Sequence, residues 1–167
     1  MNTTEYNNCV NQYADGIYRF IYKNLHNTDD SKDIVQEAFT RLWEKHNEIS
    51  SEKAKSYIFT SAYHILVDKT RKMHETSLSN GQDALQTVFR QYSDIKDVLE
   101  NAINKLPQDQ RSVIMLRDYE GYSYDEIAEI TGLTESQVKV YIFRGRTFLR
   151  KHLESQGIYS TNLEDVI

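Results

Sequence analysis

The stretch GYSYDEIAEITGLTESQVKVYIFRGRTFLRKHL, residues 121–153, contains two helix-start signals separated by one helix-stop signal. A hydroxyl residue followed three positions later by Glu or Gln forms a capping box, and this pattern occurs at Ser123–Glu126 and again at Thr134–Gln137. Between them, Gly132 can take the left-handed backbone conformation that ends a helix. The stretch therefore predicts a short helix, a tight turn and a longer helix, which together form a helix-turn-helix.

The second helix of this motif has one apolar face and is otherwise rich in cations. Helical spacing predicts that its apolar side packs against the first helix through Val138, Ile142, Gly145 and Leu149. Residues 134–153 contain one acid, Glu135, and five cations. The cations are Lys139, Arg144, Arg146, Arg150 and Lys151. A basic face is often only a solvated face, but the two caps, the glycine and the one-sided cations favour DNA binding.

The geometry of a helix-turn-helix assigns roles to these side chains. Residues near the amino end of the second helix reach base edges in the major groove, and later cations meet phosphates. Gln137 and Lys139 are thus the predicted base readers, and Arg144 and Arg146 the predicted phosphate contacts.

Composition limits what the rest of the chain can be. With 167 residues, 39% apolar content, one proline and six glycines, we expect an all-α protein made of either one ordinary domain or two small helical ones. The net charge of −5 argues against DNA binding over the whole surface, so the basic segments matter more than the sum. A lone cysteine, Cys9, excludes an internal disulfide. The absence of a signal sequence and of a long apolar run predicts a cytoplasmic protein.

Apolar spacing divides the chain into two helical blocks. We predict a three-helix domain over residues 1–76, whose third helix starts near Ser51 and ends in a basic stretch. Residues 77–94 contain an Asn-Gly turn signal and no long apolar stripe, which predicts a flexible linker. The helix-turn-helix domain then covers 95–153, and the tail 154–167 is given no function.

Three further segments, combined with the motif, resemble a known family. They are DIVQEAFTRLW (33–43), KSYIFTSAYHILVDKTRK (55–72) and LPQDQRSVIMLRDYEG (106–121). In this order they resemble a compact sigma factor of the extracytoplasmic-function group, with region 2 first and region 4 last. The resemblance implies a transcription initiation factor that binds RNA polymerase core and promoter DNA and helps open the DNA, with neither catalytic activity nor a cofactor.

The resemblance implies a polymerase-binding face on the second helix. In the family this helix binds a coiled coil of the largest polymerase subunits, beta and beta-prime. The matching residues are Asp33, Gln36, Glu37, Arg41 and Trp43. Acids and amides suit a basic partner, and an exposed aromatic suits an interface anchor. For Trp43, core packing is an equal alternative, whereas for Phe39 core packing is favoured.

The resemblance also implies that the third helix and the loop before it, residues 47–52, contact the minus-ten promoter element. Aromatic rings stack on unpaired bases, and cations follow the backbone. The matching residues are Tyr63, His64, Asp68, Arg71 and Lys72. His64 stands where the family commonly has asparagine, so the preferred minus-ten sequence is open. Tyr57, often tryptophan in the family, is expected in the core.

By the same resemblance, the second helix of the helix-turn-helix contacts the minus-thirty-five element. The matching residues are Thr134, Ser136, Gln137, Lys139, Tyr141, Arg144 and Arg146. Gln137 and Val140 replace the usual small hydroxyl residues, and Tyr141 replaces a frequent cation, so a different base preference is expected. An anti-sigma factor is the further partner that the family implies, and no small-molecule substrate is expected.

Two alternatives have different requirements. A stand-alone helix-turn-helix regulator needs a dimer interface or a sensor domain, and residues 1–76 resemble neither. An enzyme needs converging catalytic groups; Asp33 and Glu37 lie one helical turn apart, but no histidine accompanies them at the spacing of a helical metal site. No metal site is therefore expected.

Overall fold

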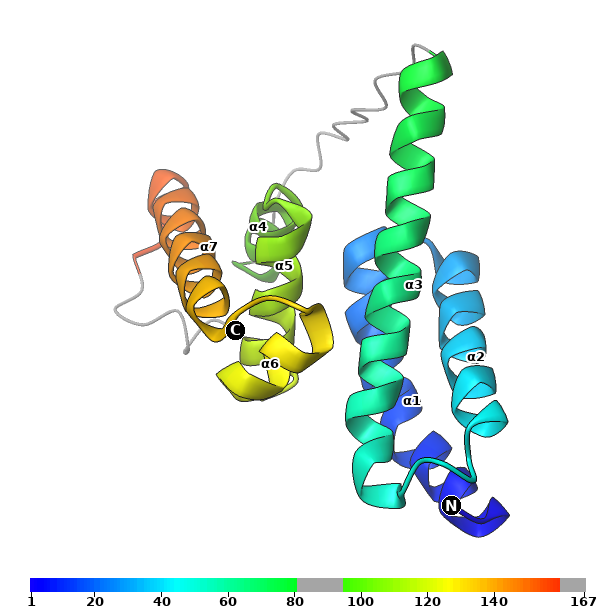
Figure 1. The fold of residues 1–167 in the computed structure, drawn as a ribbon. Helices are drawn as coiled ribbons and strands as arrows, with labels where there is room; N and C mark the ends of the chain where they lie inside the picture. Colours follow the sequence, from blue (N-terminus) through cyan, green and yellow to red (C-terminus); the bar gives the residue numbers. More distant parts are fainter. Residues whose placement is uncertain (81–94, 160–167) are drawn as a thin grey trace. The chain divides into compact units, whose positions relative to one another are not determined.

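The computed structural model describes residues 1–80 and 95–159, and it divides the chain into two compact units, Met1–Val88 and Phe89–Ile167. The described residues are mostly helical and contain no strand, which confirms the predicted all-α class (Figure 1). Each unit is described by itself below.

Unit 1 is a bundle of three mutually contacting helices, α1 (Thr3–Leu25), α2 (Thr28–Glu44) and α3 (Ser51–Asn80). Asn2 caps α1 in a capping box with Glu5, and the Asn27 side chain accepts a hydrogen bond from the Asp30 backbone N–H at the start of α2. Only His26 and Asn27 separate the first two helices.

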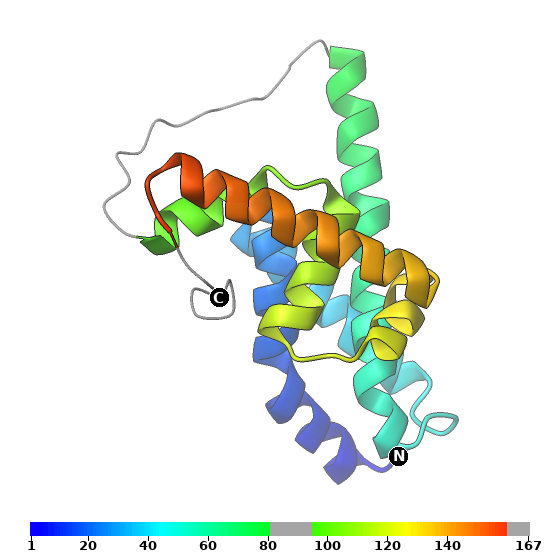
Figure 2. The same cartoon turned by 90° about the vertical axis from the view of Figure 1, so that its left-hand side faces the viewer.

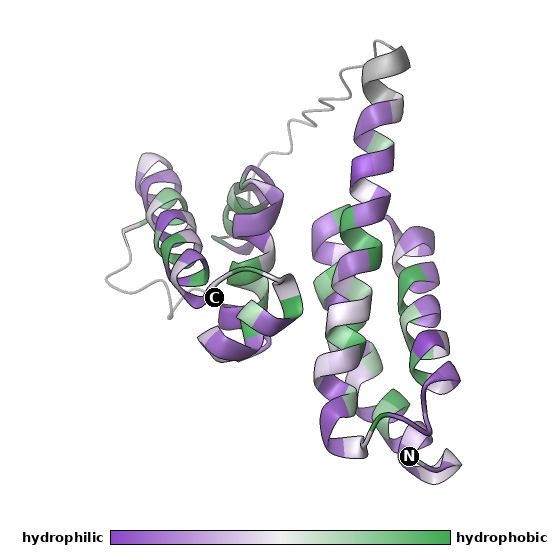
Figure 3. Cartoon of the chain, in the orientation of Figure 1, coloured by the Kyte–Doolittle hydropathy of each residue, from purple (hydrophilic) through white to green (hydrophobic). Residues whose placement is uncertain are grey.

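The core of unit 1 consists of aliphatic and aromatic side chains from all three helices. Its fully buried members are Ile17, Phe20, Ile21, Ile34, Ala38, Leu42, Ala54, Ile58, Ala62 and Leu66. α3 extends well beyond the bundle (Figure 1), and its outer part is coloured mainly hydrophilic (Figure 3). Residues 71–76 are all exposed there, so this end of α3 is available to a partner.

α3 is longer than predicted. Helix continues to Asn80, so the first four residues of the expected linker 77–94 are helical. The remaining residues of that expected linker, 81–94, lie outside the described part of the chain, as do the last eight residues of the expected tail.

Unit 2 contains four α-helices and a π-helical turn among its described residues: α4 (Ile95–Asn104), α5 (Gln108–Ile114), η1 (Met115–Tyr119), α6 (Tyr124–Thr131) and α7 (Glu135–Ser155). Pro107 is the N-cap of α5, where its fixed backbone angle suits a helix start. α7 contacts α4, α5 and α6, and α6 lies at its amino end (Figures 1 and 2). The widened turn η1, which continues α5, was not predicted.

The predicted helix-turn-helix is confirmed as α6, Gly132 and α7. Both capping boxes are formed, by Ser123 with Glu126 and by Thr134 with Gln137, and Gly132 has a φ of 73°. Gly145 lets α7 approach α5 closely, because an added Cβ would lie 3.0 Å from Ile114 side-chain carbons. The two caps and Gly132 thus determine the turn, and Gly145 determines how closely α7 packs against α5.

Candidate functional site

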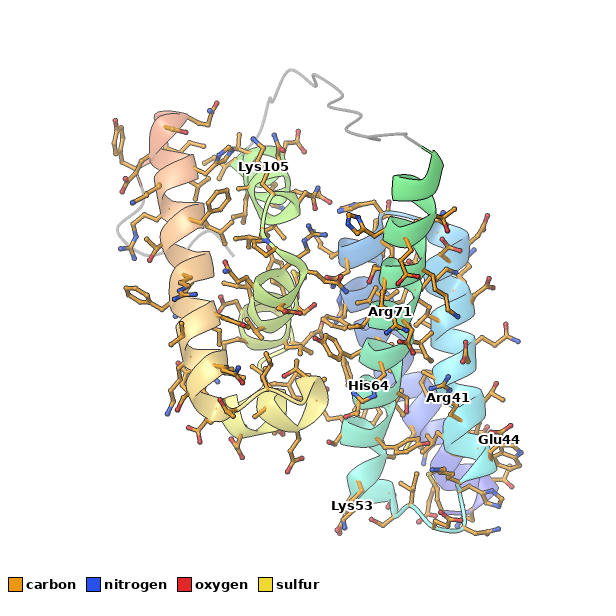
Figure 4. All side chains as sticks on the ribbon, turned by 45° about the horizontal axis from the view of Figure 1, so that its top comes forward. Arg41, Glu44, Lys53, His64, Arg71 and Lys105 are labelled. Atoms are coloured by element: carbon orange, nitrogen blue, oxygen red, sulfur yellow. The ribbon has the colours of Figure 1, made fainter. Side chains whose placement is uncertain are left out.

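The predicted polymerase-binding residues lie on one exposed face of α2. Asp33, Gln36, Glu37, Arg41 and Trp43 are all exposed, whereas Ile34, Ala38 and Leu42 on the other side are buried. Arg41 donates a hydrogen bond to Glu37 at 2.5 Å, and both side chains remain about half exposed. Figure 4 shows Arg41 and Glu44 projecting from this helix. The face therefore combines acids, an amide and one cation already paired with an acid.

Trp43 both packs within unit 1 and lies at its surface. Its ring meets Tyr6 edge-on at 4.9 Å between centroids and stacks on His46 at 4.6 Å, yet 41% of the residue is exposed. Phe39 is buried, which confirms its expected core role. The Trp43 ring is thus fixed by its neighbours but partly exposed, which suits an anchor residue at an interface.

Three of the predicted minus-ten residues share one exposed face of α3. His64, Asp68 and Arg71 are exposed at successive turns, and Arg71 donates a 3.4 Å hydrogen bond to Asp68. Figure 4 shows His64 and Arg71 along this helix. Lys72 is exposed on the neighbouring face, in the part of α3 that extends beyond the bundle.

Tyr63 and Tyr57 lie differently from what the sequence indicated. Tyr63 is only 5% exposed, so its side chain packs in the core of unit 1 and does not present its ring for stacking on a base in this structure. Tyr57 was expected in the core but is half-buried, with the Lys45 ammonium 5.9 Å from its ring centroid. The expected loop 47–52 is also shorter, because α3 already begins at Ser51.

The amino end of α7 uses two of the predicted DNA-contacting residues for its own cap. The Thr134 hydroxyl accepts a hydrogen bond from the Gln137 backbone N–H at 3.2 Å, and the Gln137 amide oxygen accepts one from the Thr134 backbone N–H at 2.9 Å. The Gln137 side chain is therefore folded back on the helix start. Ser136, between them, is exposed.

Lys139 is held in place on the surface of α7. Its ammonium is 2.6 Å from the Glu135 carboxylate and 5.5 Å from the centroid of the Tyr124 ring. The hydrogen bond with Glu135 raises the pKa of Lys139, so this side chain remains a cation. Tyr124 belongs to α6, so Lys139 also links the two helices of the motif.

Arg146, predicted to contact phosphates, is paired with an acid of unit 2. Its guanidinium donates two hydrogen bonds to the carboxylate of Asp118, one of them at 3.2 Å, and the Asp118 side chain is 8% exposed. A guanidinium committed to a nearly buried acid holds α7 against η1 and is not a free phosphate contact. Arg144, by contrast, is exposed, and Tyr141 is half-buried.

Two apolar residues of α7 lie exposed on its surface: Val140, which the sequence analysis linked to base preference, and Phe143, which it did not name as functional. Phe143 is 72% exposed and Val140 is 42% exposed, and both lie opposite the buried residues of the helix. The helical spacing that identified Val138, Ile142, Gly145 and Leu149 as buried already implied this orientation.

Within residues 1–80 and 95–159, no three His, Cys, Asp or Glu side chains are grouped so that they could hold a metal ion. No helix of the same ranges is long and apolar enough to cross a membrane.

Both units match a described protein family. Residues 9–75 match Sigma-70 region 2, and residues 96–149 match Sigma-70 region 4. The first match covers most of α1, all of α2 and α3 as far as Glu75, and the second covers α6 and α7 as far as Leu149. The two matches occur in the order that the sequence analysis inferred.

Curated sigma factors are similar to the chain in sequence, and a solved structure is similar to it in fold. The chain is 29% identical over 161 residues to the ECF RNA polymerase sigma factor SigW of Bacillus subtilis, covering 86% of each chain. It is 27% identical to the sigma factor YlaC of the same organism over 155 residues, covering 85% of this chain and 88% of YlaC. Its fold resembles that of the sigma factor RpoE crystallised with the anti-sigma factor NepR from Bartonella quintana. That likeness has a TM-score of 0.73 and 24% identity, and it covers 87% of this chain and 94% of the other.

Proposed function

The chain belongs to the sigma-70 family, and we propose that it is an extracytoplasmic-function sigma factor that binds RNA polymerase core and directs it to specific promoters. One observation carries the proposal: regions 2 and 4 occur in order on two separate units, each of which exposes a helix face of suitable chemistry. The activity proposed is binding and DNA opening, without a catalytic step and without a cofactor.

The exposed face of α2 is the proposed polymerase contact. Asp33 and Glu37 supply negative charge to basic side chains of the beta and beta-prime subunits, while Gln36 and Arg41 supply hydrogen bonds. Trp43 supplies the aromatic anchor, because its ring is fixed by Tyr6 and His46 and loses little conformational freedom on binding.

The outer face of α3 is the proposed minus-ten contact. His64, Asp68, Arg71 and Lys72 retain this role, with the cations following the backbone of the opened strand. Tyr63 is not among the proposed contacts, because its side chain is buried in the core of unit 1.

The amino half of α7 is the proposed minus-thirty-five contact. Ser136 and Lys139 are placed to reach base edges, and Arg144 is the proposed phosphate contact. Thr134 and Gln137 define the helix start, which also directs backbone N–H groups towards a phosphate. Arg146 positions α7 through its hydrogen bonds with Asp118, and Tyr141 is half-buried on the side of α7.

The weak DNA affinity expected of the chain alone explains why it needs a large partner. A handful of phosphate contacts gives nonspecific Kd values of about 10⁻⁴–10⁻⁶ M, and the net charge of −5 weakens long-range attraction to DNA. Binding of both units to polymerase core makes the second promoter contact effectively intramolecular. The chain therefore acts in the cytoplasm, where polymerase and promoters are.

An anti-sigma factor is the proposed negative regulator. The sigma factor RpoE, whose fold this chain resembles, was crystallised with the anti-sigma factor NepR. The exposed helix faces of both units offer such a protein the same surfaces that polymerase and DNA would use.

The test is transcription in vitro with sigma-free core polymerase of a related bacterium and a pool of genomic fragments. We expect discrete new start sites, reduced about tenfold by Arg144→Ala if this cation contacts the promoter. Lys96→Ala is the matched control, because Lys96 is an exposed cation of unit 2 on α4 rather than α7. No transcripts and no comigration with core would overturn the proposal, and tight binding to a palindrome without core would favour a stand-alone regulator.

A further inference from the structure

The outermost ridge of α7 is apolar at its centre. Ser136, Val140, Phe143 and Thr147 follow one another at spacings of four, three and four, on the side of the helix opposite its buried residues. Phe143 is 72% exposed, more than any other large apolar residue of the α6–α7 motif, and Val140 is 42% exposed. The buried side of α7 packs against α4, α5 and α6, so the ridge on its opposite side does not contribute to the core of unit 2.

Cations border this apolar centre on both sides. Arg144 and Lys151 lie along one side of the ridge, and Lys139 and Arg150 lie along the other, all of them exposed. The one acid in the first turn, Glu135, is already paired with Lys139. An occupant of this surface must therefore be negatively charged at its edges and apolar at its centre.

The major groove of DNA has this distribution of charge and polarity. Phosphates run along both edges of the groove, and the C5-methyl group of thymine is the apolar group that a base edge presents inside it. Valine and phenylalanine carry no hydrogen-bonding side-chain group, so they can distinguish bases only through apolar contact and shape.

We propose that Val140 and Phe143 are specificity-determining residues that contact thymine C5-methyl groups in the minus-thirty-five element. This inference rests on the proposed function, because it assumes that α7 enters the major groove of a promoter. It adds that base preference depends on apolar contact at the centre of the helix, in addition to polar contacts near its amino end.

Deoxyuridine provides a direct test, since it differs from thymidine only by lacking the C5-methyl group. Holoenzyme reconstituted with the full chain would transcribe a promoter from the experiment above, with each minus-thirty-five thymine replaced in turn on either strand. We expect transcription at subsaturating holoenzyme to fall about fourfold at one or two of these positions, the factor that corresponds to removing one buried methyl group.

Variants then assign the effect to a side chain. Phe143→Ala should reduce transcription of the thymine promoter and make it insensitive to deoxyuridine at one position, as coupling between contacting groups requires. Phe143→Leu should retain part of that sensitivity, because it keeps an apolar side chain. Phe148→Ala is the matched control, since Phe148 is also exposed on α7 but stacks on His152 away from the ridge. Circular dichroism verifies that each variant remains helical.

The outcomes separate this inference from the proposed function. Promoter-specific transcription that is insensitive to deoxyuridine at every minus-thirty-five thymine would overturn the inference and leave the sigma factor function intact. Unchanged deoxyuridine sensitivity in Phe143→Ala would also overturn it for that residue and leave the ridge to a protein partner. Absence of any promoter-specific transcription would overturn the proposed function itself.

Discussion

Several candidate contact residues of unit 2 also stabilise the fold of that unit. In unit 1, by contrast, the charged candidate contact residues pair mainly within their own helix. In unit 1, the pairs Arg41–Glu37 and Arg71–Asp68 each lie within one exposed helix. In unit 2, Thr134 and Gln137 form the cap of α7, and Arg146 bonds to an acid of another element.

The difference teaches which substitutions separate binding from folding. Exposed pairs within one helix contribute little to stability, so changing them in unit 1 should alter partner binding alone. A guanidinium on a nearly buried carboxylate contributes more, so changing Arg146 should destabilise unit 2 and reduce DNA binding only as a consequence.

The largest expected effect is that of Arg146→Ala. Removing the guanidinium leaves the Asp118 carboxylate, which is 8% exposed, without its cation, and we expect unit 2 to lose about 2–3 kcal/mol of stability. Trp43 is the chain's one tryptophan and lies in unit 1. Urea unfolding should therefore shift to lower concentration by circular dichroism, while Trp43 fluorescence retains its transition.

Arg144→Ala is the matched control for this comparison. Arg144 is exposed on the same helix, and ordinary surface substitutions change stability by less than about 0.5 kcal/mol. If Arg146→Ala unfolded like the wild-type chain but transcribed poorly, Arg146 would be a direct DNA contact and the distinction between the two units would fail there.

The second prediction concerns unit 1 and the charge of α2. Glu37→Lys replaces an acid of the proposed polymerase contact by a cation, and we expect affinity for core polymerase to fall about 10- to 30-fold through like-charge repulsion. The unfolding midpoint reported by Trp43 should change little, because only the exposed pair with Arg41 is lost. Asp15→Lys, the same charge reversal at an exposed position of α1, is the control and should bind normally. Equal losses in both variants would point to net charge rather than to this face.

The third prediction compares the two capping boxes of unit 2. Ser123→Ala and Thr134→Ala each remove an N-cap hydroxyl, and each should cost about 1 kcal/mol of stability by urea unfolding. Only Thr134 begins the proposed DNA-contacting helix. Thr134→Ala should therefore also weaken the binding of holoenzyme to promoter DNA in the absence of urea. Equal promoter binding by the two variants would limit Thr134 to a structural role.

The local parts of this fold could be predicted from the sequence. Both capping boxes and the left-handed Gly132 depend on residues within four positions of one another, so their signals are complete in a short stretch. The exposure of Phe143 was also accessible, because it follows from the same spacing that identified the buried residues of α7.

The parts that depend on packing between helices could not be predicted in this way. α3 contacts both α1 and α2, so its buried face is wide enough to include Tyr63. The bond between Asp118 and Arg146 joins residues 28 positions apart, and the π-helical turn that contains Asp118 has no simple sequence signal. Neither the burial of Tyr63 nor the commitment of Arg146 is visible in the spacing of single helices.

The smallest expected effect is a pH dependence confined to unit 2. Burial, with a further contribution from the Lys105 charge, lowers the pKa of His152 in the folded chain. The unfolded chain therefore takes up the proton first as the pH falls through about 6.5, and stability is lost as the pH decreases. Urea unfolding followed by circular dichroism at pH 7.5 and 5.5 should show a larger loss in the wild-type chain than in His152→Gln. This difference should be smaller than the effect of either cap, because His152 is partly solvated, and a loss that is equal in both chains would assign the pH dependence to other groups.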